Sequence, residues 1–145
     1  MAAPIELAEK LKAKQAVSRQ GPVPRILLLD DEPLISMLVE NWLTELGCEV
    51  VGPARSLQEG LDLAESAQLD GAILDINLGG QNSFAVAVAL RQRGVPFAFA
   101  SGDGGLDAES GFDDPIVLAK PFDFDGVRAV LGRLLAATDR RQAGA

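Results

Sequence analysis

Several residue types on which catalysis and secretion depend are missing or rare in this chain. Its 145 residues include no histidine, which excludes Ser-His-Asp and Cys-His nucleophile systems and means that the chain cannot carry phosphohistidine itself. The single cysteine, Cys48, cannot form an internal disulfide and is expected in the core. No segment is apolar enough to span a bilayer, and the amino terminus lacks a signal-peptide core. These absences predict a cytoplasmic protein.

Positive charge is also scarce. The formal net charge of -8 and the sequence pI near 4.5 argue against nucleic acid and membrane surfaces as partners, because both are anionic. The 48% apolar content of 145 residues is enough for one domain with its own core. We expect that domain over 25–137, an N-terminal extension and linker with a possible short helix over 1–24, and a disordered tail over 138–145.

Four short apolar runs each stop at an acid, a hydroxyl or an amine. The runs cover 26–29, 72–74, 97–100 and 116–119, and the residues that follow them are Asp30 with Asp31, Asp75, Ser101 and Lys120. Runs of this length are typical of buried parallel strands, and residues 50–51 are expected to form a fifth strand. Because the carboxyl ends of parallel strands meet at one edge of a sheet, these polar residues are expected to line one pocket.

Helical periodicity separates the expected strands. Helices are predicted at about 33–46, 56–66, 83–93 and 123–137, and Ser56 with Glu59 forms a capping box. Gly79 and Gly80 mark a loop after Asp75. Parallel neighbours need helical crossovers, so the alternation predicts an α/β fold with helices on both faces of a parallel sheet.

Charge predicts what this pocket binds. Asp30, Asp31 and Asp75 would repel one another by about 4 kcal/mol per pair at ~4 Å and an effective dielectric near 20. With only oxygen ligands available, a hard cation such as Mg²⁺ would relieve the repulsion. The cation and Lys120 would then share the charge of a phosphoryl group, which Ser101 would hydrogen-bond and an Asp75 oxygen would attack. The product would be an aspartyl phosphate.

Each of these residues also has a simpler interpretation. Taken alone, the Asp30-Asp31 pair is more typical of a helix cap. Ser101 fits a turn, and Lys120 a solvated strand end, as well as either fits a phosphoryl contact. Only their joint position after consecutive strands favours a phosphoryl-transfer site.

The whole set resembles the receiver domain of two-component signalling, over about residues 24–136. The matching residues are Asp30-Asp31-Glu32-Pro33, Asp75, Asn77, Ser101 and Lys120-Pro121-Phe122. The resemblance implies a flavodoxin-like doubly wound sheet of strand order 2-1-3-4-5 and a cis peptide between Lys120 and Pro121. It further implies that Asp75 is the phosphoacceptor, that Ser101 and Lys120 contact the phosphoryl group, and that Mg²⁺ is held by Asp30, Asp31, Asp75 and the backbone carbonyl of Asn77.

Two features depart from the common receiver pattern. Receivers usually carry an aromatic switch residue three positions before the lysine, whereas Val117 stands there and the chain has no tyrosine. The segment between Ser101 and Pro115 is rich in glycine and aspartate, so the fourth helix is expected to be short or disordered and to reorder on phosphorylation. Residues 96–104 are similar to the Phe-Ala-Thr-Gly-Tyr signature of a proteobacterial subclass of single-domain receivers that act with sensor histidine kinases.

The sequence therefore predicts a stand-alone response regulator and not an enzyme. It would accept a phosphoryl group from a phosphohistidine of a sensor histidine kinase or histidine phosphotransfer protein. It would then signal to a downstream protein partner or act as a phosphate sink, and no output domain is expected after a helix that ends near Ala137. The alternative is a binding module that works without phosphorylation. A Mg²⁺-dependent phosphatase would need an aspartate at position 77, where Asn77 stands.

Overall fold

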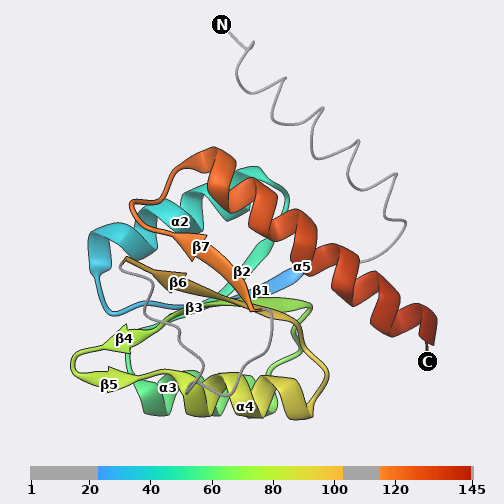
Figure 1. Cartoon of the computed structure of the whole chain (residues 1–145), viewed down its shortest axis with the longest axis horizontal. Coiled ribbons are helices and arrows are strands. Elements are labelled where there is room, and N and C mark those ends of the chain that lie inside the picture. The colour runs from blue at the N-terminus through green and yellow to red at the C-terminus, as the bar shows by residue number, and fades with distance from the viewer. Residues whose placement is uncertain (1–22, 103–114, 145) are drawn as a thin grey trace, which may run out of the picture.

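A five-stranded parallel sheet forms the centre of the molecule (Figure 1). The computed structural model describes residues 23–102 and 115–144, and it describes side chains as far as Asp139. The sheet has the order β2-β1-β3-β6-β7, and every neighbouring pair is parallel. Its strands are β1 (Arg25–Leu29), β2 (Glu49–Ala54), β3 (Gly71–Asp75), β6 (Phe97–Ser101) and β7 (Ile116–Ala119). When only these five strands are numbered along the chain, β6 and β7 become the fourth and fifth, and the order is 2-1-3-4-5. This order confirms the flavodoxin-like prediction.

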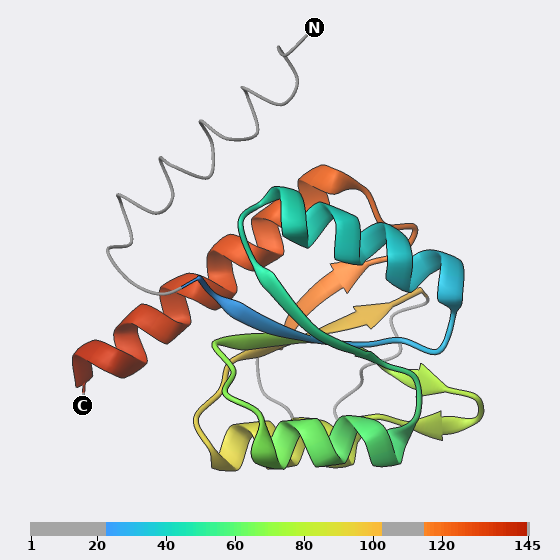
Figure 2. The ribbon, with the colours of Figure 1, turned by 180° about the vertical axis from the view of Figure 1, so that it is seen from behind.

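Helices cover both faces of the sheet (Figures 1 and 2). One layer holds α2 (Pro33–Glu45) and α5 (Phe124–Gly144), and the other holds α3 (Leu57–Ser66) and α4 (Phe84–Gln92). Alternate strand residues serve the two layers: Ile26 and Leu28 pack with α2 and α5, whereas Leu27 and Leu29 pack on the opposite face. Burial on both faces explains why the strands are continuously apolar. No helix within the described ranges is long and apolar enough to cross a membrane.

The local signals at the helix starts behave largely as expected. Pro33 occupies the first turn of α2, and the Ser56 hydroxyl accepts a hydrogen bond from the Glu59 backbone N–H at 3.1 Å. The Glu59 carboxylate accepts from the N–H of Arg55, so the capping box closes one residue earlier than its usual form. Cys48 is buried, as predicted.

The second strand is longer than the sequence predicted. The sequence predicted a strand over residues 50–51, but β2 continues through Gly52 and Pro53 to Ala54. The Ala54 carbonyl oxygen accepts from the N–H of Asp30 at 3.0 Å. Gly52 has a φ of +100°, and the register of β1 against β2 shifts there. A proline is tolerated because β2 is the edge strand of this sheet.

The predicted loop after Asp75 is a small β-hairpin. Strands β4 (Asn77–Leu78) and β5 (Gln81–Asn82) pair antiparallel around Gly79 and Gly80. Both glycines have positive φ, +56° and +93°, which is the conformation that a two-residue hairpin turn requires. The Gly-Gly pair was the signal for this hairpin.

The predicted end of the last helix near Ala137 is wrong, and so is the disordered tail for residues 138–144. Helix α5 runs to Gly144 because Thr138 is fully buried and its hydroxyl donates a hydrogen bond to the carbonyl oxygen of Asp70. This contact ties the helix to the turn before β3, and the alanines around Thr138 favour helix. The short helix predicted within 1–24 and the fourth-helix segment over 103–114 lie outside the described residues.

Candidate functional site

The polar residues at the strand ends share one edge of the sheet. Asp30 follows β1, Asp75 ends β3, Ser101 ends β6 and Lys120 follows β7. Asp75 pairs with Ala100 of the neighbouring strand, and the Lys120 N–H donates to the Ser101 carbonyl oxygen at 2.9 Å. The Asp30, Asp75 and Ser101 side chains are buried. The structure thus brings the predicted site residues of four strands to a single edge.

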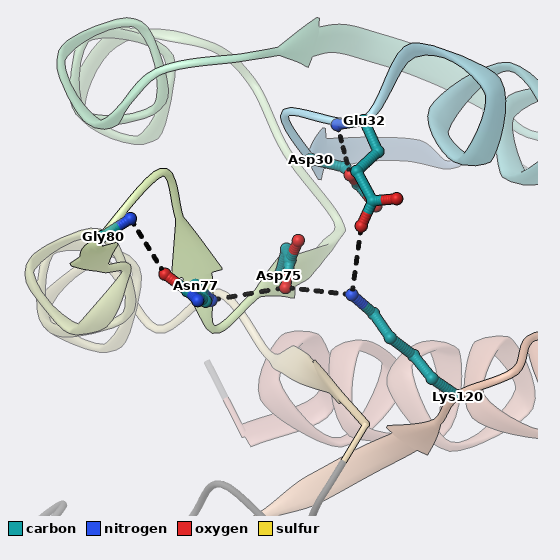
Figure 3. A network of polar contacts seen from close by, with 6 residues as sticks. All are labelled: Asp30, Glu32, Asp75, Asn77, Gly80 and Lys120. Carbon is teal, nitrogen blue, oxygen red and sulfur yellow. Dashed lines mark hydrogen bonds and ion pairs between the residues drawn. The ribbon is translucent and has the colours of Figure 1, made fainter.

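An unbroken chain of polar contacts crosses this edge (Figure 3). The ammonium of Lys120 lies 3.3 Å from Oδ1 of Asp75 and 3.8 Å from Oε1 of Glu32. The backbone N–H of Glu32 donates to Oδ1 of Asp30 at 2.8 Å. On the other side, the N–H of Asn77 donates to the same Asp75 oxygen at 3.3 Å, and the N–H of Gly80 donates to the Asn77 side-chain oxygen at 3.1 Å.

Three carboxylates are close enough to share one cation. Asp30, Glu32 and Asp75 each place an oxygen within 4.8 Å of the other two. The donor set is all oxygen, which fits a hard divalent ion such as Mg²⁺ and disfavours zinc or copper. Glu32 was not among the metal ligands that the sequence predicted, so its place in this group was missed.

Asp31 lies next to the hairpin of β4 and β5. A Cβ built on Gly79 would stand 3.7 Å from Oδ2 of Asp31, in ordinary van der Waals contact. The Asp31 charge also contributes to a raised pKa of Asp75. Asp31 is therefore a near neighbour of Asp75 but is not one of the three mutually close carboxylates.

Burial sets the protonation of the two inner acids. It raises the pKa of Asp30 to about 6, although the hydrogen bond from the Glu32 N–H opposes the shift. Burial also raises the pKa of Asp75, against the lowering effects of Lys120 and of the Asn77 N–H. Burial disfavours the charged forms of both carboxyl groups, so a cation that bound here would compete with protons.

The turn after β7 returns Lys120 to this edge. The Lys120–Pro121 peptide is cis, which confirms the prediction. The lysine ammonium also lies 5.6 Å from the centre of the Phe122 ring, within the range of a cation–π contact. Val117, at the usual position of the aromatic switch, is 41% exposed on β7. Any signal in this chain must therefore leave the site without an aromatic side chain at that position.

Comparison with known proteins identifies the family. Residues 26–131 match the response regulator receiver domain, so the chain belongs to this family of two-component signalling proteins. The solution structure of SdrG from Sphingomonas melonis is 42% identical, with a TM-score of 0.69 over 78% of this chain and 97% of SdrG. A response regulator receiver protein from Sinorhizobium medicae is 29% identical, with a TM-score of 0.72 over 80% of this chain and 97% of that protein.

Longer regulators also match. The DNA-binding dual master transcriptional regulator RpaA of Synechocystis is 34% identical over 81% of this chain and 52% of its own length. The phyllosphere-induced regulator PhyR of Methylorubrum extorquens is 34% identical over 76% of this chain and 43% of its own. The chain thus spans about half the length of the curated relatives that it matches.

Proposed function

We propose that this chain is a phosphoacceptor and that Asp75 receives the phosphoryl group. The observation that carries the proposal is the 3.3 Å contact between Lys120 and Asp75, inside a group of carboxylates at the carboxyl ends of parallel strands. A lysine held against a buried carboxylate is placed to stabilise the negative charge that phosphorylation brings to that carboxylate.

Each site residue then has a role. Asp30, Asp31, Asp75 and the backbone carbonyl of Asn77 would hold Mg²⁺, which supplies neutralising charge to the phosphoryl oxygens. An Asp75 oxygen forms the new bond to phosphorus, while the bond from phosphorus to the donor's imidazole nitrogen breaks. The Ser101 hydroxyl and the Lys120 ammonium hydrogen-bond the phosphoryl oxygens.

The chain has no histidine, so the phosphoryl group must come from another molecule. For a receiver domain, that donor is a phosphohistidine of a sensor kinase or of a histidine phosphotransfer protein. A solution structure of SdrG describes a BeF3-activated conformation, and SdrG is 43% identical in that comparison with a TM-score of 0.65, which supports a receiver that can be activated. We extend the same behaviour to the receiver domain of this chain. Its output would be contact with a protein partner or removal of phosphoryl groups from the kinase, without binding of nucleic acid or membrane.

Labelling experiments test the function. The chain is incubated with a phosphorylated histidine kinase, or with a small acyl phosphate, with and without Mg²⁺. We expect one phosphoryl group per chain, dependence on the metal, and complete loss of label in Asp75→Asn. A wild-type chain that takes no label from either donor would favour the phosphorylation-independent binding module, and multiple turnover of the donor would favour a phosphatase.

A further inference from the structure

Glu32 is the charged residue of the polar network in Figure 3 that has no role in the proposed phosphoryl transfer. It is the residue just before α2, where its carbonyl oxygen accepts from the N–H of Ser36 at 2.9 Å and its side chain makes no capping hydrogen bond. That side chain points toward Lys120 instead, with its Oε1 3.8 Å from the lysine ammonium (Figure 3). The Glu32 backbone therefore accepts a hydrogen bond of the first helical turn, while its carboxylate contacts Lys120 at the site.

Lys120 is shared between two carboxylates of different exposure. Asp75 is buried, with 4% of its side chain exposed, whereas the Glu32 side chain is 60% exposed. The inner contact to Asp75 is the shorter of the two. A phosphoryl group on Asp75 would occupy the space between these carboxylates and would need the same ammonium.

We infer that Glu32 is a positioning residue that competes with the phosphoryl group for Lys120 and so shortens the lifetime of the phosphorylated state. The inference rests on the proposed function of Asp75. In the resting protein the lysine ammonium contacts Asp75 on its buried side and Glu32 on its exposed side. After phosphorylation the Glu32 charge both attracts the lysine outward and repels the phosphoryl oxygens, which destabilises the aspartyl phosphate relative to the free carboxylate.

Hydrolysis is the step that this repulsion favours. A water oxygen forms a bond to phosphorus, the bond between phosphorus and the Asp75 oxygen breaks with its electron pair left on the carboxylate, and the water proton leaves with the phosphate or solvent. Loss of the phosphoryl group returns Lys120 to its contacts with Asp75 and Glu32. The same repulsion weakens the approach of an anionic donor.

The test compares Glu32→Gln with Glu32→Asp and with Glu45→Gln, which removes an exposed charge at the far end of the same helix. Each protein is labelled by a small acyl phosphate at saturating Mg²⁺, the donor is removed, and the loss of label is followed. We expect Glu32→Gln to lengthen the half-life by roughly three- to tenfold and to lower the donor concentration for half-maximal labelling. Glu32→Asp keeps the charge but withdraws it from Lys120 by about one methylene group, so its half-life should lie between those of wild type and Glu32→Gln. Glu45→Gln should keep the wild-type half-life.

Salt supplies a readout that a purely structural role would not change. Because Glu32 is mostly exposed, the difference between wild type and Glu32→Gln should shrink as ionic strength rises. The side-chain NMR signal of Lys120 should also move in Glu32→Gln and not in Glu45→Gln. A wild type that labels normally while Glu32→Gln keeps or shortens the wild-type half-life overturns this inference alone. A wild type that takes no label overturns the proposed function and this inference with it.

Discussion

Lys120 and Asp75 lie 45 positions apart in the chain, yet the lysine ammonium stands 3.3 Å from a buried oxygen of the aspartate. Each side chain comes from the carboxyl end of its own strand, and β6 lies between those strands in the sheet. The contact therefore depends on the parallel topology. Burial raises the pKa of Asp75 and so favours its neutral acid form, whereas the Lys120 ammonium lowers the pKa and favours the carboxylate.

The first prediction concerns this pair. Lys120→Met keeps much of the aliphatic volume and removes the ammonium, so Asp75 should still be buried but should phosphorylate slowly. We expect the labelling rate with a small acyl phosphate to fall by roughly 10²- to 10³-fold. The protein should stay folded, since Asp75 can take a proton when its partner is lost. A labelling rate within a fewfold of wild type would contradict the role of Lys120.

The second prediction is a pH dependence of stability in the absence of metal. The pKa of Asp30 is raised to about 6 in the folded protein against 3.8 as its ordinary value, so between these pH values the folded state holds a proton that the unfolded chain has released. The Asp30 contribution to stability is therefore largest below pH 3.8 and is lost as the pH rises through about 6.

Asp30→Asn removes this dependence and provides the measurement. At pH 7 without metal, the variant should be more stable than wild type by roughly 1 kcal/mol, and the difference should narrow at pH 5. Thermal unfolding at the two pH values measures both. Adding Mg²⁺ should reverse the order, because the wild type gains a ligand charge that the variant lacks. If the stabilities of wild type and Asp30→Asn changed with pH in parallel, the raised pKa of Asp30 would be contradicted.

The strand-end residues were predictable because one rule of parallel sheets places them. Short apolar runs that stop at Asp30, Asp75, Ser101 and Lys120 needed only the common edge of the strands to bring them together. The place of Glu32 was not predictable in the same way. Its contact with Lys120 depends on the conformations of two long side chains, and sequence spacing does not determine those conformations.

The helix end and the hairpin show two further limits. Helix α5 continues past Ala137 because of the bond between Thr138 and Asp70, which lie 68 positions apart, and no local pattern reveals such a contact. The hairpin after Asp75 had a local signal in Gly79-Gly80, but strands of two residues are too short for periodicity to detect.

The third prediction separates metal affinity from folding at Asp31. This carboxylate faces Asp75 closely enough to affect its pKa, so Asp31→Ala should relieve repulsion in the metal-free protein. We expect the unfolding free energy without metal to stay equal or rise slightly, whereas Mg²⁺ affinity should fall by at least tenfold. Titration calorimetry with Mg²⁺ measures the affinity. Unchanged affinity would remove Asp31 from the metal site.

The fourth prediction tests the tie between α5 and the sheet. Thr138→Val keeps the buried shape but removes the hydroxyl that donates to the Asp70 carbonyl oxygen. The change should cost about 1 to 2 kcal/mol of unfolding free energy, because a part-buried carbonyl loses a partner. Hydrogen exchange of the last turns of α5 should become faster, while labelling at Asp75 should stay at the wild-type rate. A fall in labelling would show that the helix end influences the site.

The last prediction concerns the hairpin beside the phosphoacceptor. A Cβ at Gly80 would meet nothing within 4 Å, so Gly80→Ala is costly only through its φ of +93°. We expect a loss of about 1 to 2 kcal/mol in unfolding free energy. Because the Gly80 N–H donates to the Asn77 side chain, and the Asn77 N–H donates to Asp75, labelling should slow as well.

Gly132→Ala is the matched control, since Gly132 lies within α5 with equally open space around it. There the same methyl group should raise the unfolding free energy by up to about 1 kcal/mol and leave labelling unchanged. Equal effects of the two alanines on stability would mean that the hairpin backbone is not held in this conformation, and an unchanged labelling rate in Gly80→Ala would separate the hairpin from the chemistry of Asp75.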